Sequence, residues 1–578
     1  MAEVNTTALG IDALLVLQRS DVNHLATEPE RWAGVPLLFI DPGTMDAAIQ
    51  AGFGHYALRR LQLDRDLPAR VYSEALTRAS ALDQALTRER RALWSTGPGD
   101  HTPYSGWDQM LLYMSLQRAF MARALGECVA AQFPEGRLGL LRPDPAQLMN
   151  FDGMLSTEMA AVDPQRFVFV GRYEAVRFHD AQMTRLAWHT EGLRQCVLEQ
   201  GGVDGVAHIP TCFYDARTFA EQIRAAHPRL LDLPGTYCDI ALSPRRPQFM
   251  RVADTPANTF DGSPLRYRER ALAVYREHLA GWMPSRAALE QQAQLWAERS
   301  HQQALNHLGL VRALEGQTPR FIVADHDTGQ NGPIYSAAAR LGSPITVLPH
   351  SGYATSMLPH ARQVTAVESV GFGAAVRSVL GQPITVRPVR YRAVPPAPPA
   401  RPAARRVCLL LNTMLSEGIS HVDFFPLVAF YKRLAVLCTA HGAELQVRLK
   451  PSTPALTVVA AAFGQPAAWF QQAFAKPIAQ AADEADLAIA YGEPTSGIAS
   501  FLDADSLVLH VSEQDWPADT LITPPYMRDG LLPSLHGDAA LAEVHRLLAD
   551  AALYQARQQR QSQAYAARTA GAFATLFD

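Results

Sequence analysis

The sequence predicts an α/β protein with two Rossmann-like, doubly wound domains, and three observations carry this prediction. Short, uninterrupted apolar runs recur along the chain, with helix-compatible tracts between them. Such runs are typical of parallel strands buried on both faces, which need long crossover connections. A proline-rich stretch divides the chain into unequal parts, and residues 541–578 have the composition of a helical segment that returns across the molecule.

Residues 1–394 are expected to form one α/β domain with substantial helical insertions. Helical tracts are expected at about 70–95, 108–132 and 265–308. Buried strands are predicted where short apolar runs occur, at 13–17, 36–40, 138–141, 167–170, 321–324 and 345–348.

The second domain is expected at 405–540, after a linker at 395–404. Proline fixes φ and has no backbone N–H, so the linker is predicted to be extended and semi-rigid. The strand-like runs of this domain are 406–411, 444–449, 486–490 and 506–511, and a helical pattern covers 424–438. Strands that alternate with helices indicate a parallel sheet.

The composition excludes several classes of protein. The chain has 578 residues and a net charge of −4, so no global field would attract nucleic acid. Six scattered cysteines form no C-x-x-C pair, and no apolar stretch is long enough to span a membrane. We therefore expect a cytoplasmic protein that is at most peripheral to a membrane. Only three lysines accompany 49 arginines, a ratio that codon bias explains.

In doubly wound sheets, ligands bind beyond the carboxyl ends of the strands. The run at 487–490 is followed by Glu493, Thr495, Ser496 and Gly497, where a helix is expected to begin. Hydroxyls and free N–H groups at a helix N-terminus suit a phosphate, although a simple helix cap has the same composition.

A second loop follows the run at 444–449. Strand alternation would place Arg448 and Lys450 on one side, with Ser452 after them. Two cations beside the Thr495 loop would hold a diphosphate or a nucleoside monophosphate. A solvated strand end is the alternative. The loop after 406–411 adds Asn412, Ser416 and Glu417 as weaker candidates for hydrogen bonds to a nucleotide or sugar.

The first domain offers a candidate base. Asp325 and Asp327 follow one predicted strand, and His350 follows the next. Neighbouring parallel strands would bring these side chains to one edge, where a carboxylate can deprotonate a hydroxyl. A turn or a helix cap is the alternative reading. No clear acidic metal loop accompanies them, so no metal is assigned.

These features together resemble the GT-B glycosyltransferases. Residues 341–352, LGSPITVLPHSG, look like the R-x-G-I-P-x-x-x-x-Q-H-G segment of bacterial capsule and lipopolysaccharide transferases, from which Pro349 and Ser351 depart. The segments RLKPS at 448–452 and TSGIAS at 495–500 look like the motifs with which CMP-Kdo and CMP-sialic acid transferases hold CMP, with Lys450 in place of a histidine.

The resemblance implies inverting transfer of a sugar from a nucleotide-activated donor, such as a CMP-linked ulosonic acid, to a bacterial surface glycan or glycoprotein. It implies an acceptor-side first domain and a nucleotide-sugar-binding second domain. Asp327, or Asp325 instead, would act as the base. No cofactor and no nucleic-acid partner is expected, and peripheral contact with the inner membrane is left open. The cations and hydroxyls that would neutralise the departing phosphate are Arg448, Lys450, Thr495 and Ser496.

Two other functions fit the same architecture. A nucleotide-sugar epimerase would also clamp a diphosphate but would need no separate acceptor. A non-catalytic assembly or export protein would bind the nucleotide sugar or glycan without turnover.

Overall fold

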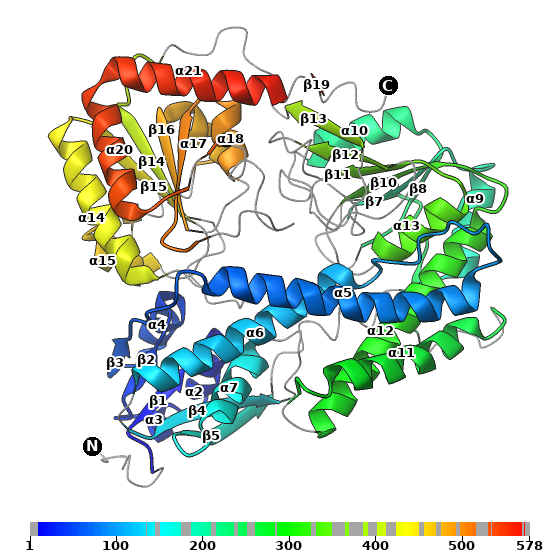
Figure 1. Cartoon of the computed structure of the whole chain (residues 1–578), viewed down its shortest axis with the longest axis horizontal. Helices are drawn as coiled ribbons and strands as arrows, with labels where there is room; N and C mark the ends of the chain where they lie inside the picture. The colour runs from blue at the N-terminus through cyan, green and yellow to red at the C-terminus, as the bar shows by residue number, and fades with distance from the viewer. Residues whose placement is uncertain are drawn as a thin grey trace.

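The computed structural model describes most of the chain. The described residues are 10–133, 136–144, 151–174, 187–209, 216–235, 241–250, 252, 260–283, 286–324, 331–348, 364–368, 385–390, 401–411, 423–449, 456–466, 468–469, 476–492, 497–515, 530–532, 534–568 and 571–572. Within them lie three parallel sheets flanked by helices (Figure 1). The predicted doubly wound α/β class is confirmed.

The first sheet has the order β3-β2-β1-β4-β5. Its strands are β1 (Ala13–Val16), β2 (Leu37–Phe39), β3 (Tyr56–Leu58), β4 (Leu138–Asp144) and β5 (Phe167–Glu174). The helices close to it are α2 (Arg19–Leu25), α3 (Pro29–Trp32), α4 (Pro42–Gln50) and α7 (Phe151–Val162). β1 is buried along its whole length, which explains its continuous apolar sequence.

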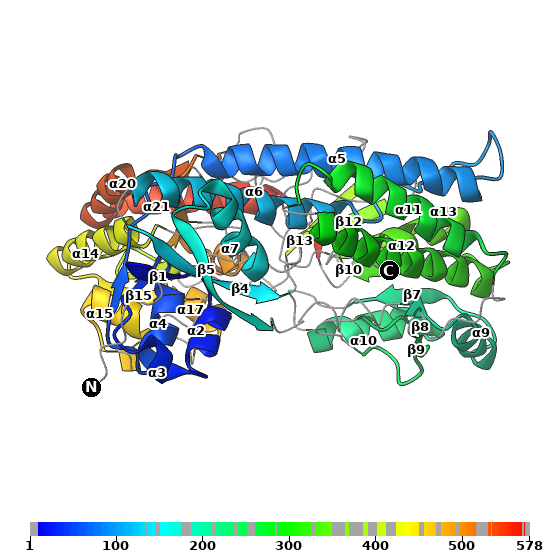
Figure 2. The ribbon, with the colours of Figure 1, turned by 90° about the horizontal axis from the view of Figure 1, so that it is seen from below.

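Four helices pack together beside the sheets. They are α5 (Leu67–Trp94), α6 (Gln109–Gln132), α11 (Ser263–Leu279) and α12 (Arg286–Ala313). α5 packs against α6 and α11, and α11 packs against α12 (Figure 2). The tract expected at about 265–308 is helical, and it consists of two helices, with Gly281 in the break between them.

The second sheet has the order β19-β13-β12-β11-β10-β7-β8. Its strands are β7 (Gly205–His208), β8 (Leu230–Asp232), β10 (Arg320–Ala324), β11 (Ile345–Leu348), β12 (Val364–Glu368), β13 (Thr385–Arg390) and β19 (Gly571–Ala572). Nearby lie α9 (Thr190–Glu199), α10 (Ala216–Ala226), α13 (Asn331–Arg340) and the short antiparallel pair β6 (Ala187–Trp188) and β9 (Phe249–Met250). The direction of strand order reverses between β7 and β10, which makes this the topological switch point.

The third sheet has the order β15-β14-β16-β17-β18. Its strands are β14 (Arg406–Leu411), β15 (Glu444–Leu449), β16 (Leu487–Tyr491), β17 (Leu507–Val511) and β18 (Ser534–Leu535). The flanking helices are α14 (Phe424–Ala440), α15 (Leu456–Phe463), α17 (Ile478–Glu484) and α18 (Gly497–Asp503). Four of the five strands match the predicted runs.

The C-terminal segment is helical and returns across the molecule, as the sequence predicts, and it reaches the second sheet. α20 (Gly537–Ala549) and α21 (Ala551–Arg568) follow the third sheet. β19 then pairs in parallel with β13, with Gly571 opposite Val389 (Figure 1). The C-terminal segment therefore joins the second and third sheets.

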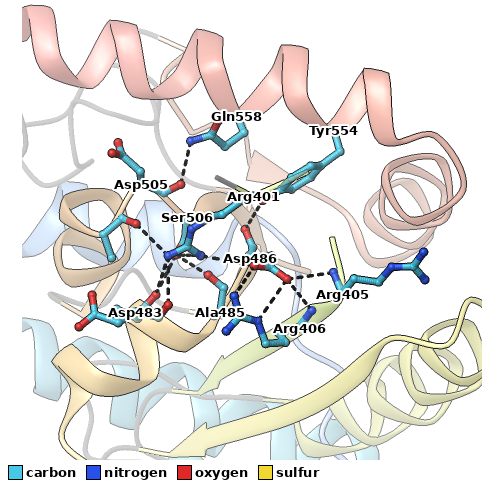
Figure 3. A network of polar contacts seen from close by, with 12 residues as sticks. Arg401, Arg405, Arg406, Asp483, Ala485, Asp486, Asp505, Ser506, Tyr554 and Gln558 are labelled. Atoms are coloured by element: carbon cyan, nitrogen blue, oxygen red, sulfur yellow. Dashed lines mark hydrogen bonds and ion pairs between the residues drawn. The ribbon is translucent and has the colours of Figure 1, made fainter. Parts of the chain in front are cut away.

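A buried polar network anchors the end of the linker at the amino edge of the third sheet (Figure 3). The Arg401 guanidinium donates to the carbonyls of Asp483 at 3.3 Å and Ala504 at 2.9 Å, and to Ser506 Oγ at 3.1 Å. Asp486 accepts from the Arg406 guanidinium at 2.8 Å. These contacts lie at the edge opposite the predicted ligand loops and have a structural role.

The region 1–394, which we expected to hold one α/β domain, contains the whole first sheet and every strand of the second sheet except β19. No strand pairing between these two sheets is found in the described part of the chain. The same part contains no helix that is both long enough and apolar enough to cross a membrane.

Candidate functional site

The carboxyl edge of the third sheet brings together the starts of three predicted ligand loops. Leu411, the last residue of β14, pairs in register with Leu449 of β15 and Tyr491 of β16. The loops that follow these strands therefore begin side by side. The predicted ligands on them that lie outside the described residues are Asn412, Ser416, Glu417, Lys450, Ser452, Glu493, Thr495 and Ser496.

Two of the predicted ligand residues are described. The half-buried Arg448 guanidinium donates to the carbonyl of Lys476 at 2.5 Å, and burial lowers its pKa. Leu449 packs in the core that includes α14, on the other face from Arg448. Gly497 is the buried first residue of α18. Arg448 is thus held at the strand end by a backbone contact near α17.

His510 fixes the backbone where the predicted phosphate loop begins. Its Nε2–H donates to the Gly492 carbonyl at 2.8 Å, and its Nδ1 accepts from Ser534 Oγ at 3.0 Å. Complete burial lowers the pKa of His510 to about 4. The ring is therefore neutral at pH 7, and we assign it a positioning role.

The segment 59–66, which precedes α5, lies against this same edge and was not predicted. Arg60 donates to Asp423 Oδ2 from both Nε and Nη2 at 3.3 Å. Asp423 is the N-cap of α14, and its Oδ1 accepts from Phe425 N. Arg65 Nε donates to the Glu513 carbonyl at 3.3 Å, just after β17. No local signal distinguishes these two arginines from the other 47.

Carboxylates also contribute to the electrostatics of this edge. Burial raises the pKa of Asp423, while the Arg60 guanidinium acts in the opposite direction. Burial, together with the carboxylates of Glu513 and Asp423, raises the pKa of the Tyr491 phenol. The edge thus carries charges of both signs, contributed by the third sheet and by the segment before α5.

The second sheet places its predicted catalytic loops next to each other. Ala324 of β10 pairs with Leu348 of β11, so the segments that contain Asp325, Asp327 and His350 begin on adjacent strands. These three residues lie outside the described part of the chain.

His208 lies at the switch point, opposite Val323 of β10. It is fully buried, its Nδ1 is 3.2 Å from the Leu233 carbonyl, and its ring meets Trp188 edge-on. This histidine is therefore a core residue.

The helical layer fixes the first turn of α13, which follows the Asp325–Asp327 segment. Asn331 Nδ2 donates to the Ala324 carbonyl at 2.8 Å, which ties the two ends of the segment together. A Cβ on Gly332 would lie only 2.2 Å from Trp107 Cα. Trp107 Nε1 donates to Ser336 Oγ at 2.6 Å. The backbone before α6 thus packs directly on α13.

A buried ionic cluster lies next to Trp107. Arg90 is fully buried and donates to Asp83 Oδ1 at 2.8 Å and to Tyr267 OH at 2.7 Å. Asp108 lies 3.7 Å from Arg90 and 3.5 Å from Arg299, and burial raises its pKa. Removing one charged residue of this cluster would leave the charge of its partner uncompensated inside the protein.

Comparisons with known proteins add little to this geometry. No protein-family model matches the chain, and no curated protein matches it. Among solved structures, the chain is similar to the glycosyltransferase SnogD from Streptomyces nogalater, with 14% sequence identity and a TM-score of 0.34. The match covers 64% of this chain and 96% of that one. At this level of similarity it does not indicate a shared function. Fold and geometry define a parallel α/β protein with candidate ligand loops on two sheets.

Proposed function

We propose that the protein is an inverting glycosyltransferase of the GT-B type that transfers a sugar from a nucleotide-activated donor to a bacterial surface glycan or glycoprotein. One observation carries the proposal: the strand registers align the starts of polar loops at the carboxyl edges of the second and third sheets. The C-terminal segment, which contains β19 beside β13, joins these two sheets.

The third sheet is assigned the donor. Lys450, Thr495 and Ser496, together with Arg448, would neutralise the phosphate as it leaves the sugar, because developing negative charge is stabilised by fixed cations and N–H or O–H donors. The sequence likeness to CMP-dependent transferases makes a CMP-linked ulosonic acid the first donor to test.

The second sheet is assigned the acceptor. Asp327, or Asp325 in its place, takes the proton from the acceptor hydroxyl, and His350 orients the carboxylate. The acceptor oxygen then forms a bond to the anomeric carbon on the face opposite the phosphate. The bond from that carbon to the phosphate oxygen breaks, and the nucleotide leaves with the electron pair.

The first test is nucleotide binding. A ligand that binds only the folded state raises the melting temperature. Screening CMP, UDP, GDP and dTDP by thermal shift should give one nucleotide that raises the Tm, and a flat response to all four would contradict the proposal.

The second test is transfer with Lys450→Ala and Asp327→Ala. We expect Lys450→Ala to weaken donor binding, and we expect Asp327→Ala to reduce kcat by about 100-fold or more while donor binding is retained. Transfer that survives both changes would overturn the assignment. Sugar isomerisation without acceptor would indicate an epimerase instead.

A further inference from the structure

The segment that links β3 to α5 closes one side of the third sheet's carboxyl edge. Besides the contacts of Arg60 with Asp423, the backbone N–H of Asp515 donates to the Arg65 carbonyl at 2.9 Å. The Arg65 guanidinium also contacts the His536 ring, which precedes α20. In Figure 1 this segment runs into α5 directly beneath the strands of the third sheet.

The two arginines flank the start of the predicted phosphate loop. Arg60 contacts Asp423, at the end of the connection that follows β14, and Arg65 contacts Glu513, just after β17. β16 lies between β14 and β17 in the sheet, and the phenol of Tyr491 at the end of β16 is close enough to both Asp423 and Glu513 for their charges to raise its pKa. The chain therefore leaves β16 near both contacts.

We propose that Arg60 and Arg65 bind the phosphate groups of the nucleotide donor, so that the first part of the chain completes the donor site. This inference rests on the function proposed above and adds two phosphate-binding residues from outside the proposed nucleotide-binding domain. Arginine suits the role because its planar guanidinium can donate two parallel hydrogen bonds to a phosphate.

Contacts within the described part of the chain occupy only some of the N–H donors of each guanidinium, and for Arg65 these are Nε, on the Glu513 carbonyl, and Nη2, on the His536 ring. A guanidinium has five N–H donors, and Arg60 uses two of them on one carboxylate oxygen. Its side chain is 46% exposed, whereas that of Asp423 is 24% exposed.

The same ion pair gives the proposal a sharp test, because its two members should act in opposite directions. Arg60→Gln removes the cation and keeps a polar side chain, so nucleotide affinity should fall about tenfold or more, as expected for a lost charge-assisted hydrogen bond. Asp423→Asn removes the competing carboxylate and keeps a good N-cap residue. This second variant should bind nucleotide as tightly as the wild type or more tightly.

Arg65→Gln should weaken binding in the same way as Arg60→Gln. Arg70→Gln is the matched control, because it removes an arginine charge only five residues further along, where the partners are Asp64 and Asp66. The control should leave affinity within about twofold, since the Arg70 guanidinium is exposed and its charge is already paired with two exposed carboxylates.

The measurement is titration calorimetry on the full chain with the nucleotide found by thermal shift and with its phosphate-free nucleoside. Phosphate binding by these arginines predicts that the variants lose affinity for the nucleotide but not for the nucleoside. Equal losses in Arg60→Gln and Asp423→Asn would show that the pair is only structural and would overturn the inference while the proposed function stands. Absence of nucleotide binding by the wild-type protein would overturn both.

Discussion

At the residue scale, single buried polar side chains hold backbone segments that have no regular structure. Arg401 does so at the end of the linker, where its guanidinium donates to the Asp483 carbonyl in the last turn of α17 and to the Ala504 carbonyl just after α18. His510 does so at the start of the predicted phosphate loop. In both cases, a charged or polar group replaces the backbone partners that a strand or helix would supply.

Replacing Arg401 with leucine should lower the free energy of unfolding by about 3–5 kcal/mol, because buried carbonyls and Asp486 would lose their cationic partner. Urea denaturation at pH 7 measures the change. The neighbouring exposed Arg405, whose guanidinium donates to the His441 carbonyl, provides the comparison. Arg405→Leu should cost less than about 0.5 kcal/mol, and equal costs would contradict this account.

His510 should make the protein sensitive to acid. Its pKa of about 4 in the folded state lies below the value of about 6.5 expected for an unfolded chain, so the native state resists protonation. Stability is therefore fully present above pH 6.5 and is lost as the pH falls toward 4. Between pH 7 and pH 5 this histidine should account for about 2 kcal/mol.

The check is the free energy of unfolding of His510→Asn at both pH values. The variant should lose less stability than the wild type between pH 7 and pH 5, by about that amount. The difference in the free energy of unfolding between the wild type and His510→Asn at pH 7 measures the cost of the lost hydrogen bonds, separately from the effect of protonation. An unchanged pH dependence would count against the assigned neutral ring.

At the element scale, the position of α13 depends on close packing against the segment before α6. Gly332 allows this contact, because any Cβ there would collide with the backbone of Trp107. The hydrogen bond from Trp107 to Ser336 then fixes the helix along its axis. Since the Asp325–Asp327 segment leads directly into α13, this packing fixes one end of the proposed catalytic loop.

Gly332→Ala should destabilise the protein by about 3 kcal/mol or more, because the clash is with backbone and cannot be relieved by a rotamer change. It should also lower kcat more than it raises the donor KM, since the third sheet is left intact. Gly281→Ala is the control, because no atom of the described residues lies within 4 Å of its Cβ position. Similar losses in the two variants would refute the packing argument.

At the scale of the whole molecule, the three sheets are tied together by contacts between distant parts of the chain. α4 packs on α15, and the buried Asp46 Oδ1 accepts from Val458 N at 3.1 Å, in the first turn of α15. β19 connects to the second sheet. Together, these contacts hold the donor edge and the first part of the chain in one arrangement.

Asp46→Ala should weaken this contact and lower stability by about 1–3 kcal/mol, because the Val458 N–H would stay buried without an acceptor. Asp46→Asn keeps an acceptor and should recover most of the loss. Thermal unfolding and limited proteolysis of full-length variants measure the effect. The exposed Asp64 gives the control Asp64→Ala, which should behave like the wild type.

The short apolar runs predicted most of the strands in the first and third sheets, because strands buried on both faces leave an uninterrupted signal. They did not reveal β7, β8, β12 or β13. β8 has only three residues, β7 contains glycine and histidine, and Pro388 interrupts the apolar pattern of β13.

Of the candidate site, the sequence indicated which polar loops follow strands. It did not indicate the contribution of Arg60 and Arg65.

The sequence by itself determined the α/β class, the alternation of strands and helices and the returning C-terminal segment, because burial and chain stiffness act locally and leave periodic patterns. Only the tertiary structure decided that the first 394 residues form two sheets, that Gly332 meets Trp107, and that Arg60 reaches Asp423 across 363 positions of sequence. Such contacts depend on how whole layers pack, and no local pattern of residues encodes which layers meet.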